Sequence, residues 1–290
     1  MKNVAGKVAF ITGGGSGIGL GIARVFVNAG MKAVIADLRQ DHLDAAMQYF
    51  KDNGQGENVH AIRLDVSDRD AMAAAADETE KVFGKVHVLV NNAGVGIEGP
   101  LARATYTDWD FGMGVNLGGV INGIQTFLPR IRAHGEGGHI VNTASLAALV
   151  TMPAFMVMYV ASKAAVLALS EALSTELPQE NIGVTVLMPG PVKSNIHELG
   201  KNRPQQFRGD SGFAEAERNL GQRQVSDLWM EPEEVGEMIL DAVLNDKLYV
   251  ITHGEWRPAA EARFNALLAA MPEKINPDLI ASLQKAGEGD

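Results

Sequence analysis

Tyr159 and Lys163 are the pair of residues in this sequence best suited to proton transfer. They are four positions apart, so on a helix they lie on one face, one turn from each other. A phenol with its ordinary pKa of about 10 is a poor base at neutral pH, whereas a neighbouring ammonium group favours the phenolate and lowers that pKa. The spacing also arises by accident, and Lys163 could be a solvated helix charge. The pair predicts acid–base chemistry if the rest of a site lies nearby.

A glycine-rich turn could supply a second part of such a site. Residues 12–19 follow an apolar run and open a helical pattern, so they would present backbone N–H groups and the positive end of a helix dipole to a diphosphate. Asp37 ends the next apolar run, about twenty residues on, where a carboxylate can accept hydrogen bonds from ribose hydroxyls. Each feature alone could be structural, but together they predict a dinucleotide site.

The Asp37 carboxylate favours NAD as the cofactor, because it would repel the 2′-phosphate of NADP. Ser16 brings no positive charge to such a phosphate. Arg39 is the argument for the alternative, since its guanidinium could pair with the 2′-phosphate. A positive nicotinamide ring next to Tyr159 would add to the effect of Lys163, so we expect the pKa of Tyr159 to fall toward the working range.

The chain alternates short apolar runs with longer helical patterns, which is typical of repeated βαβ units around a parallel sheet. The expected strands span residues 7–12, 32–37, 59–65, 86–91, 139–143, 183–188 and 248–252. The expected helices span residues 17–29, 40–53, 68–83, 107–133, 157–178 and 233–245. The nearly continuous apolar strands indicate an α/β fold, a doubly wound parallel sheet with helices on both faces.

Two regions interrupt the alternation. Residues 193–230 are polar and rich in turn residues, and we predict that they form a substrate-binding loop or lid, with a mobile surface loop as the alternative. Residues 255–290 continue past the last strand as a C-terminal helical extension. Because no repeat or linker divides the chain, residues 1–290 are expected to form a single dinucleotide-binding catalytic domain.

Composition narrows the partners. A formal net charge of −10 argues against nucleic acid and against an anionic membrane surface, which both require clustered positive charge. The chain has no cysteine, and its seven histidines show no paired ligand spacing, so we predict no metal site. The absence of cysteine also fits a reducing compartment, and no apolar stretch suggests a signal peptide or a membrane span. We expect a cytoplasmic protein.

The glycine turn has the spacing Thr-Gly-x-x-x-Gly-x-Gly, and it resembles that of the short-chain dehydrogenase/reductase superfamily. Other landmarks of that family occur in order over residues 7–194: Asp65-Val66, Asn91-Asn92-Ala93-Gly94, Asn116, Ser145, Tyr159 with Lys163, and Pro189-Gly190. The resemblance implies a single-domain Rossmann-type sheet and a Ser-Tyr-Lys active site with an accompanying Asn. It also implies a nicotinamide cofactor held by Gly13, Ser16, Gly17, Ile18, Gly19, Asp37, Asp65, Val66, Asn92, Tyr159, Lys163, Pro189, Val192 and Ser194.

The resemblance implies hydride transfer between a secondary alcohol and its ketone. Tyr159 would exchange the hydroxyl proton, and Lys163 would lower the phenol pKa and hold the nicotinamide ribose. Ser145 would hydrogen-bond the substrate oxygen, and Asn116 would hold a water that links Lys163 to solvent. Taken singly, Ser145 could cap a loop and Asn116 could satisfy a buried carbonyl. Ser194 stands where the family usually has Thr.

The substrate is expected to be shaped by residues 146–158, 193–230 and the extension. Residues 146–158 are apolar and rich in methionine, so they would either line a pocket for a large flat substrate or fill a core or subunit contact. Residues 188–198 and 249–256 resemble those of bacterial dehydrogenases that oxidise the benzylic alcohol of lignin-derived β-aryl ethers. This resemblance predicts a bulky aryl secondary alcohol.

Other outcomes remain open from the sequence. The scaffold could serve a hydroxysteroid or polyol dehydrogenase, an NADPH-dependent ketone reductase, or a dinucleotide sensor without chemistry. By resemblance, the two long helices would pair with other copies and form a homodimer or homotetramer through apolar residues such as Phe127, Leu167 and Leu173. The alternative is that these residues face the sheet.

Overall fold

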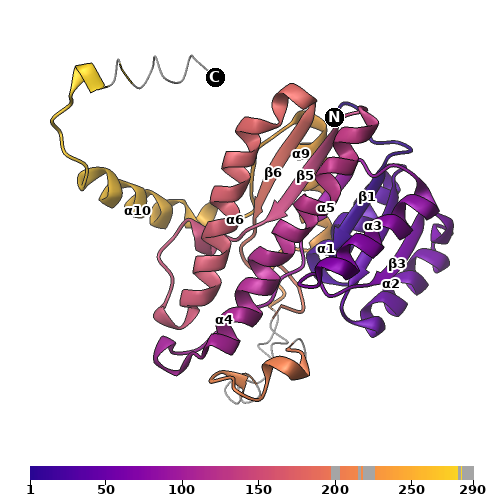
Figure 1. The fold of residues 1–290 in the computed structure, drawn as a ribbon, viewed down its shortest axis with the longest axis horizontal. Coiled ribbons are helices and arrows are strands. Elements are labelled where there is room, and N and C mark those ends of the chain that lie inside the picture. Colours follow the sequence, from indigo (N-terminus) through magenta and orange to yellow (C-terminus); the bar gives the residue numbers. More distant parts are fainter. Residues whose placement is uncertain (197–202, 215–216, 218–225, 280–281, 283–290) are drawn as a thin grey trace. The chain divides into compact units, whose positions relative to one another are not determined.

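The computed structural model describes residues 1–196, 203–214, 217, 226–279 and 282. Within residues 1–254, seven strands form one parallel sheet in the order β3-β2-β1-β4-β5-β6-β7 (Figure 1). The strands are β1 (Val8–Thr12), β2 (Lys32–Asp37), β3 (Val59–Arg63), β4 (Val88–Asn91), β5 (Gly138–Thr143), β6 (Ile182–Met188) and β7 (Tyr249–Ile251). The predicted single-domain Rossmann-type α/β sheet is confirmed.

Helices follow the strands in alternation. They are α1 (Gly17–Asn28), α2 (Gln40–Asp52), α3 (Arg69–Phe83), α4 (Tyr106–Met113), α5 (Gly119–His134), α6 (Val157–Glu176), α9 (Pro232–Asn245) and α10 (Arg257–Ala269). Short 3₁₀ turns cover Gly56–Asn58, Leu101–Arg103, Leu146–Ala148, Ala154–Met156, Pro178–Glu180, Gln205–Phe207 and Gly254–Trp256. Several helices begin where the sequence offers a cap: Asp68 accepts a hydrogen bond from the Ala71 N–H at the start of α3.

Each face of the sheet is covered by helices, because successive strand residues point to opposite sides. On one face, Ile11 of β1 belongs to a buried cluster with residues of α1, α2 and α9. On the other face, Phe10 belongs to a cluster with residues of α3, α5 and α6. With both faces buried, the strands read as continuous apolar runs.

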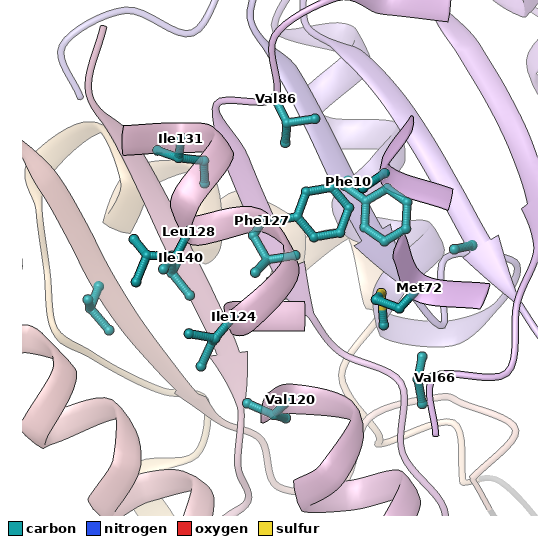
Figure 2. Packing of buried hydrophobic residues seen from close by; sticks show 14 of the residues in the cluster. Phe10, Val66, Met72, Val86, Val120, Ile124, Phe127, Leu128, Ile131 and Ile140 are labelled. Carbon is teal, nitrogen blue, oxygen red and sulfur yellow. The ribbon is translucent and has the colours of Figure 1, made fainter. Parts of the chain in front are cut away.

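The second cluster centres on two aromatic rings. Phe10 of β1 and Phe127 of α5 lie with their ring centroids 4.4 Å apart, and both are fully buried (Figure 2). Leu173 of α6 is buried in the same cluster, and Leu167 packs against it. The prediction that Phe127, Leu167 and Leu173 form outward faces for other copies is therefore wrong: these side chains cover the sheet.

The helix predicted over residues 107–133 is interrupted. A π-helical segment, Gly114–Gly118, separates α4 from α5. Such segments in otherwise α-helical runs occur frequently at functional sites. The segment contains Asn116, so the interruption falls at a predicted site residue.

The predicted site residues lie at the carboxyl ends of the parallel strands. Connections from β1 lead outward to β2 and β3, while the later strands lie on the opposite side of β1. In open parallel sheets, ligands bind at the carboxyl ends of the strands near this change of direction. The glycine turn after β1 and Asn92 after β4 lie at that point.

Residues 154–176, which include α6, form a stretch long and apolar enough by length and composition to cross a membrane, with a mean hydropathy of 1.5. The expectation that no apolar stretch reaches this length is therefore wrong, although one such helix is weak evidence for a span and α6 packs against β5 and β6 of the sheet. Residues 255–290 form a second unit, whose described part includes α10 with the exposed apolar residues Phe264, Leu267 and Leu268.

Candidate active site

The turn between β1 and α1 has the shape that a diphosphate requires. Gly13 and Gly17 have positive φ values of 63° and 52°, a region that favours glycine. A Cβ atom on Gly19 would lie 2.2 Å from the Gly13 carbonyl oxygen, so the turn also needs glycine there for close packing. Helix α1 begins at Gly17, and the N–H groups of a first helical turn have no partner within the helix. The turn therefore offers donors to an anion.

Asp37 is fixed at the end of β2, beside this turn. Its carboxylate accepts hydrogen bonds from the Gly15 N–H at 3.2 Å and from the Arg39 N–H at 3.0 Å. The Arg39 guanidinium is paired with the Asp41 carboxylate, and that pairing lowers the pKa of Asp41 to about 2. The Arg39 guanidinium, which could have paired with the 2′-phosphate of NADP, thus already contacts the Asp41 carboxylate.

Asn92 is held by Thr12, the first residue of the glycine-turn motif. The hydroxyl oxygen of Thr12 accepts hydrogen bonds from the backbone N–H groups of Asn92 at 2.9 Å and Ala93 at 3.0 Å. The Asn92 amide donates to the Thr12 carbonyl at 3.1 Å. Buried Thr12 therefore ties the ends of β1 and β4 together, a role that depends on strand pairing and that the motif alone does not reveal.

One pocket joins these residues to the predicted proton-transfer pair. Its lining includes most of the predicted cofactor residues: Gly13, Ser16, Gly17, Ile18, Asp37, Asp65, Val66, Asn92, Tyr159, Lys163, Pro189 and Ser194. Gly19 and Val192 take other places. Gly19 packs against Gly13, and the Val192 side chain is buried in the core near α9, with a backbone bridge to Met230.

Lys163 is buried and anchored. It is 3% exposed, and its Nζ donates a hydrogen bond to the Thr143 carbonyl oxygen at 2.9 Å, at the end of β5. The same Nζ lies 5.9 Å from the centre of the Tyr159 ring. Burial lowers the pKa of Lys163 to about 8. The predicted proximity of the two side chains is confirmed.

The pKa of Tyr159 differs from the expectation. Burial raises it above its ordinary value, the hydrogen bond with the Ser145 hydroxyl lowers it, and the negative charge of Glu98 raises it further. The expected fall depends on the positive nicotinamide ring as well as on Lys163, and the protein's own atoms alone raise this pKa, because the loss of hydration outweighs the stabilisation of the phenolate. Glu98 carried no signal in the sequence, since its influence comes from tertiary proximity alone.

Ser145 and Asn116 lie next to this pair. The Ser145 hydroxyl, which bonds to Tyr159, also accepts a hydrogen bond from the Ala147 N–H at 3.1 Å. The Asn116 side chain is fully buried, accepts from the Val95 N–H at 2.8 Å and donates to the Val95 carbonyl at 3.0 Å. A Cβ atom on Gly94 would lie 3.3 Å from both Asn116 Oδ1 and Lys163 Nζ, so only glycine separates them without crowding.

The apolar end of the pocket comes from segments that the sequence did not connect. Beside Tyr159, the pocket is lined by Val95, Phe111, Val115, Ile196, Pro204 and Phe207. Among the described residues, no lining residue comes from 146–158, so that stretch does not form the predicted wall: Leu146 and Met158 are buried in packing and Phe155 is exposed. Phe111 and Phe207 carried no spacing signal, because they are brought together by the fold. Part of the predicted lid, residues 197–202, 215–216 and 218–225, lies outside the described residues.

Comparisons with known proteins agree with this geometry. Residues 7–204 match the family model of the short chain dehydrogenases. The chain is 41% identical over 281 residues to a protein named C alpha-dehydrogenase from Sphingobium sp. (strain NBRC 103272 / SYK-6), covering 96% of this chain and 91% of that one.

Two solved structures have the same fold. The apo form of LigO from Sphingobium sp. strain SYK-6 has a TM-score of 0.78 and 41% identity, with 99% of this chain and 97% of that chain covered. A short chain dehydrogenase/reductase from Burkholderia phymatum in complex with NAD has a TM-score of 0.86 and 34% identity, with 95% and 99% covered. The chain therefore belongs to the short-chain dehydrogenase family, as an NAD(P)-dependent alcohol dehydrogenase or reductase similar to C alpha-dehydrogenase.

Proposed function

We propose that this enzyme oxidises a bulky aryl secondary alcohol, of the benzylic type found in lignin-derived β-aryl ethers, to its ketone with NAD. The observation that carries the proposal is one pocket that joins a glycine turn and Asp37 to Tyr159 and Lys163. The chain thus brings a dinucleotide cradle and a proton-transfer group to the same space. The resemblance to a protein named C alpha-dehydrogenase supports the substrate class.

The residues present fit a dinucleotide. The positive φ values of Gly13 and Gly17 keep the turn open, and the first turn of α1 faces it with donors. Asp37 would accept hydrogen bonds from the adenosine ribose, and Asp65, Val66 and Asn92 would line the adenosine half. The carboxylate of Asp37 and the pairing of Arg39 with Asp41 favour NAD over NADP.

The proposed chemistry needs one group besides the protein: NAD, which the glycine turn and Asp37 would hold, would supply the acceptor for the hydride of the carbinol carbon. Tyr159 takes the hydroxyl proton of the alcohol, and in the reverse direction it returns that proton. Ser145, bonded to the phenol, would donate to the substrate oxygen and stabilise its developing charge. Lys163, held by the Thr143 carbonyl, would place its positive charge where it favours the phenolate.

Asn116 would support the same proton path. Its carbonyl oxygen faces Lys163 across Gly94, while its amide bonds fix it to Val95. The π-helical segment gives this side chain its inward position. We propose that this arrangement keeps the environment of the ammonium polar in an otherwise buried site, and lets a water relay protons between Lys163 and solvent.

Aromatic and aliphatic side chains at the substrate end support a ring-bearing alcohol. Phe111, Phe207, Val95 and Val115 give this end an apolar wall, which suits an aryl group better than a polyol.

We also propose that residues 1–290 act as one catalytic unit in the cytoplasm and that residues 193–230 close over the substrate.

A homodimer or homotetramer through the outer faces of α5 and α6 is a further part of the proposal. The apolar residues Ile121 and Val157 support it, because 41% of the first and 37% of the second are exposed on these helices. Sedimentation of the purified protein measures this directly. A monomer at micromolar concentration would contradict it.

The test of the activity is a substrate panel with purified enzyme and either NAD or NADP, followed by NADH or NADPH absorbance. The panel contains benzylic β-aryl ether alcohols, hydroxysteroids and polyols. We expect oxidation of the aryl alcohols with NAD and a loss of at least about a hundredfold in Tyr159→Phe. Turnover of steroids or polyols but not aryl alcohols would refute the substrate, and unchanged activity in Tyr159→Phe would refute the chemistry.

A further inference from the structure

Three charged side chains are buried together next to the apolar end of the pocket. The side chains of Asp108, Arg203 and Glu217 are each at most 1% exposed. Arg203 donates to both oxygens of Glu217 in a two-pronged pair, with Nε 2.8 Å from one of them, and its Nη1 lies 3.1 Å from an oxygen of Asp108. Asp108 belongs to α4, whereas Arg203 and Glu217 belong to the insertion, residues 193–230 between β6 and α9. The cluster therefore connects segments about a hundred residues apart in sequence, a separation for which local patterns give no signal.

Asp108 also accepts hydrogen bonds from its own helix start and from the insertion. The N–H and hydroxyl of Thr105 bond to it in the capping box that starts α4. From the insertion, the Ser211 hydroxyl and the Gly212 N–H donate to it. Burial raises the pKa of Asp108, but these hydrogen bonds outweigh that effect and hold the pKa below its usual value. The carboxylate is therefore ionised and fully satisfied at neutral pH.

The cluster stands directly behind the pocket wall. Arg203 Nη1 also donates to the Phe207 carbonyl oxygen at 3.3 Å, and the guanidinium carbon lies 4.7 Å from the centre of the Phe111 ring. The rings of Phe111 and Phe207 are 5.5 Å apart with a 37° angle between their planes. Both rings line the pocket that contains Tyr159, and in Figure 1 the orange insertion lies beside α4. Arg203 thus holds the backbone of Phe207 and packs on the face of the Phe111 ring.

A buried ion cluster is a poor way to gain stability, because the lost hydration of the charges offsets most of their attraction. Apolar neighbours were available for simple packing here, since Phe213, Ile97 and Met158 already form a small core with Phe111. The charged groups instead impose a defined geometry. The N–H groups of the planar guanidinium point in fixed directions, so they bond the two carboxylates and the Phe207 carbonyl only in certain positions. The cluster is better suited to set geometry than to hold the segment down.

We propose that Phe111 and Phe207, packed on each other, form the aromatic wall against which the aryl ring of the substrate binds, and that Arg203, held by Asp108 and Glu217, is the positioning residue that fixes this wall. This inference rests on the proposed function, because it assigns the aryl group of that substrate to a place. Phe207 then determines specificity, and Arg203 acts through it without touching the substrate.

The test compares a benzylic β-aryl ether alcohol with a small alkyl secondary alcohol in three variants. Phe207→Leu leaves the ion cluster intact, and Phe207→Tyr keeps an aromatic ring. Arg203→Met replaces the guanidinium, with its bonds to the carboxylates and to the Phe207 carbonyl, by an uncharged side chain of similar length. We expect Phe207→Leu and Arg203→Met to raise the KM of the aryl substrate about tenfold with little change in kcat. The KM of the alkyl alcohol and the Kd of NADH should stay unchanged, and Phe207→Tyr should keep the aryl preference.

Arg132→Met is the matched control, because Arg132 pairs with Glu176 and Glu180 on the exposed surface. It should not alter the aryl-to-alkyl ratio. Equal losses on both substrates in Phe207→Leu, or an unchanged aryl-to-alkyl ratio in both Phe207→Leu and Arg203→Met, would overturn this aryl-binding wall while leaving the proposed function in place. No turnover of aryl alcohols by the wild-type enzyme would overturn both.

Discussion

The Thr143 carbonyl oxygen accepts a hydrogen bond from Lys163 Nζ at 2.9 Å, which ties the end of β5 to the helix that carries Tyr159. The bond holds a cation in a buried place, 3% exposed, where its pKa falls to about 8. The ammonium therefore titrates close to the range in which a dehydrogenase works. This gives the stability and the chemistry of the site a shared dependence on pH.

Stability should rise with pH because of Lys163. The folded pKa of about 8 lies below the ordinary value of 10.5, so the fold favours the neutral amine. The ammonium costs stability below pH 8, and the cost disappears as pH rises to 10.5, a change of about 3 kcal/mol in the free energy of unfolding. Denaturant unfolding of wild type and Lys163→Met at about pH 7 and about pH 10 measures it. Parallel behaviour of the two proteins would contradict the prediction.

Glu98 should tune the pH profile of oxidation. Its negative charge raises the pKa of Tyr159, so Glu98→Gln should lower that pKa. Because oxidation needs the phenolate, the rise of kcat/KM with pH should then begin at a lower pH, and reduction should lose activity at a lower pH as well. Glu57→Gln, which removes a charge from an exposed turn, is the control. A profile that shifts equally in both variants, or toward higher pH in Glu98→Gln, would refute the assignment.

Asp37 should decide between the two nicotinamide cofactors. Asp37→Ser removes the carboxylate that would bond the adenosine ribose and repel a 2′-phosphate. We expect kcat/KM with NAD to fall about ten- to a hundredfold and the ratio of NADP to NAD activity to rise. Asp44→Ser removes the same charge from the exposed face of α2 and should leave the ratio unchanged. Steady-state kinetics with both cofactors gives the answer, and an unaltered ratio in Asp37→Ser speaks against it.

The packing of Phe127 on Phe10 should dominate the stability of the central sheet. Both rings are fully buried, so Phe127→Ala leaves a cavity and should cost about 3–5 kcal/mol of unfolding free energy. Phe155→Ala, with a ring that is 41% exposed, should cost less than about 1 kcal/mol. Urea unfolding followed by circular dichroism compares them. Equal costs for the two substitutions would contradict the prediction.

Most of the strands and helices could be predicted from local patterns in the sequence. All seven predicted strands and five of the six predicted helices correspond to single elements in the structure, and the sixth, over residues 107–133, is divided into α4 and α5. The strands were recognisable because both faces of the sheet are covered, so their sequences are continuous apolar runs. The spacing of Tyr159 and Lys163 placed both on one face of α6, since that relation depends only on the helical repeat. The glycine turn followed by Asp37 was recognisable for the same reason: each part depends on its own short segment.

Other features depend on contacts between distant segments. The sequence could not show that Phe127 turns toward Phe10, that Gly114–Gly118 leaves the α-helical repeat, or that Thr12 holds Asn92. It left open whether residues 146–158 line the pocket or fill a core, because apolar composition does not reveal which of the two a side chain meets, and the structure favours the core.

Short-range patterns were enough to predict the succession of strands and helices, the glycine turn and the helical spacing of Tyr159 and Lys163, because each of these depends on residues close together in the chain. The pKa of Tyr159 and the contact between Phe111 and Phe207 depend on the folded arrangement. Burial and electrostatic surroundings are sums over neighbours from many segments, and the chain must fold before those neighbours exist.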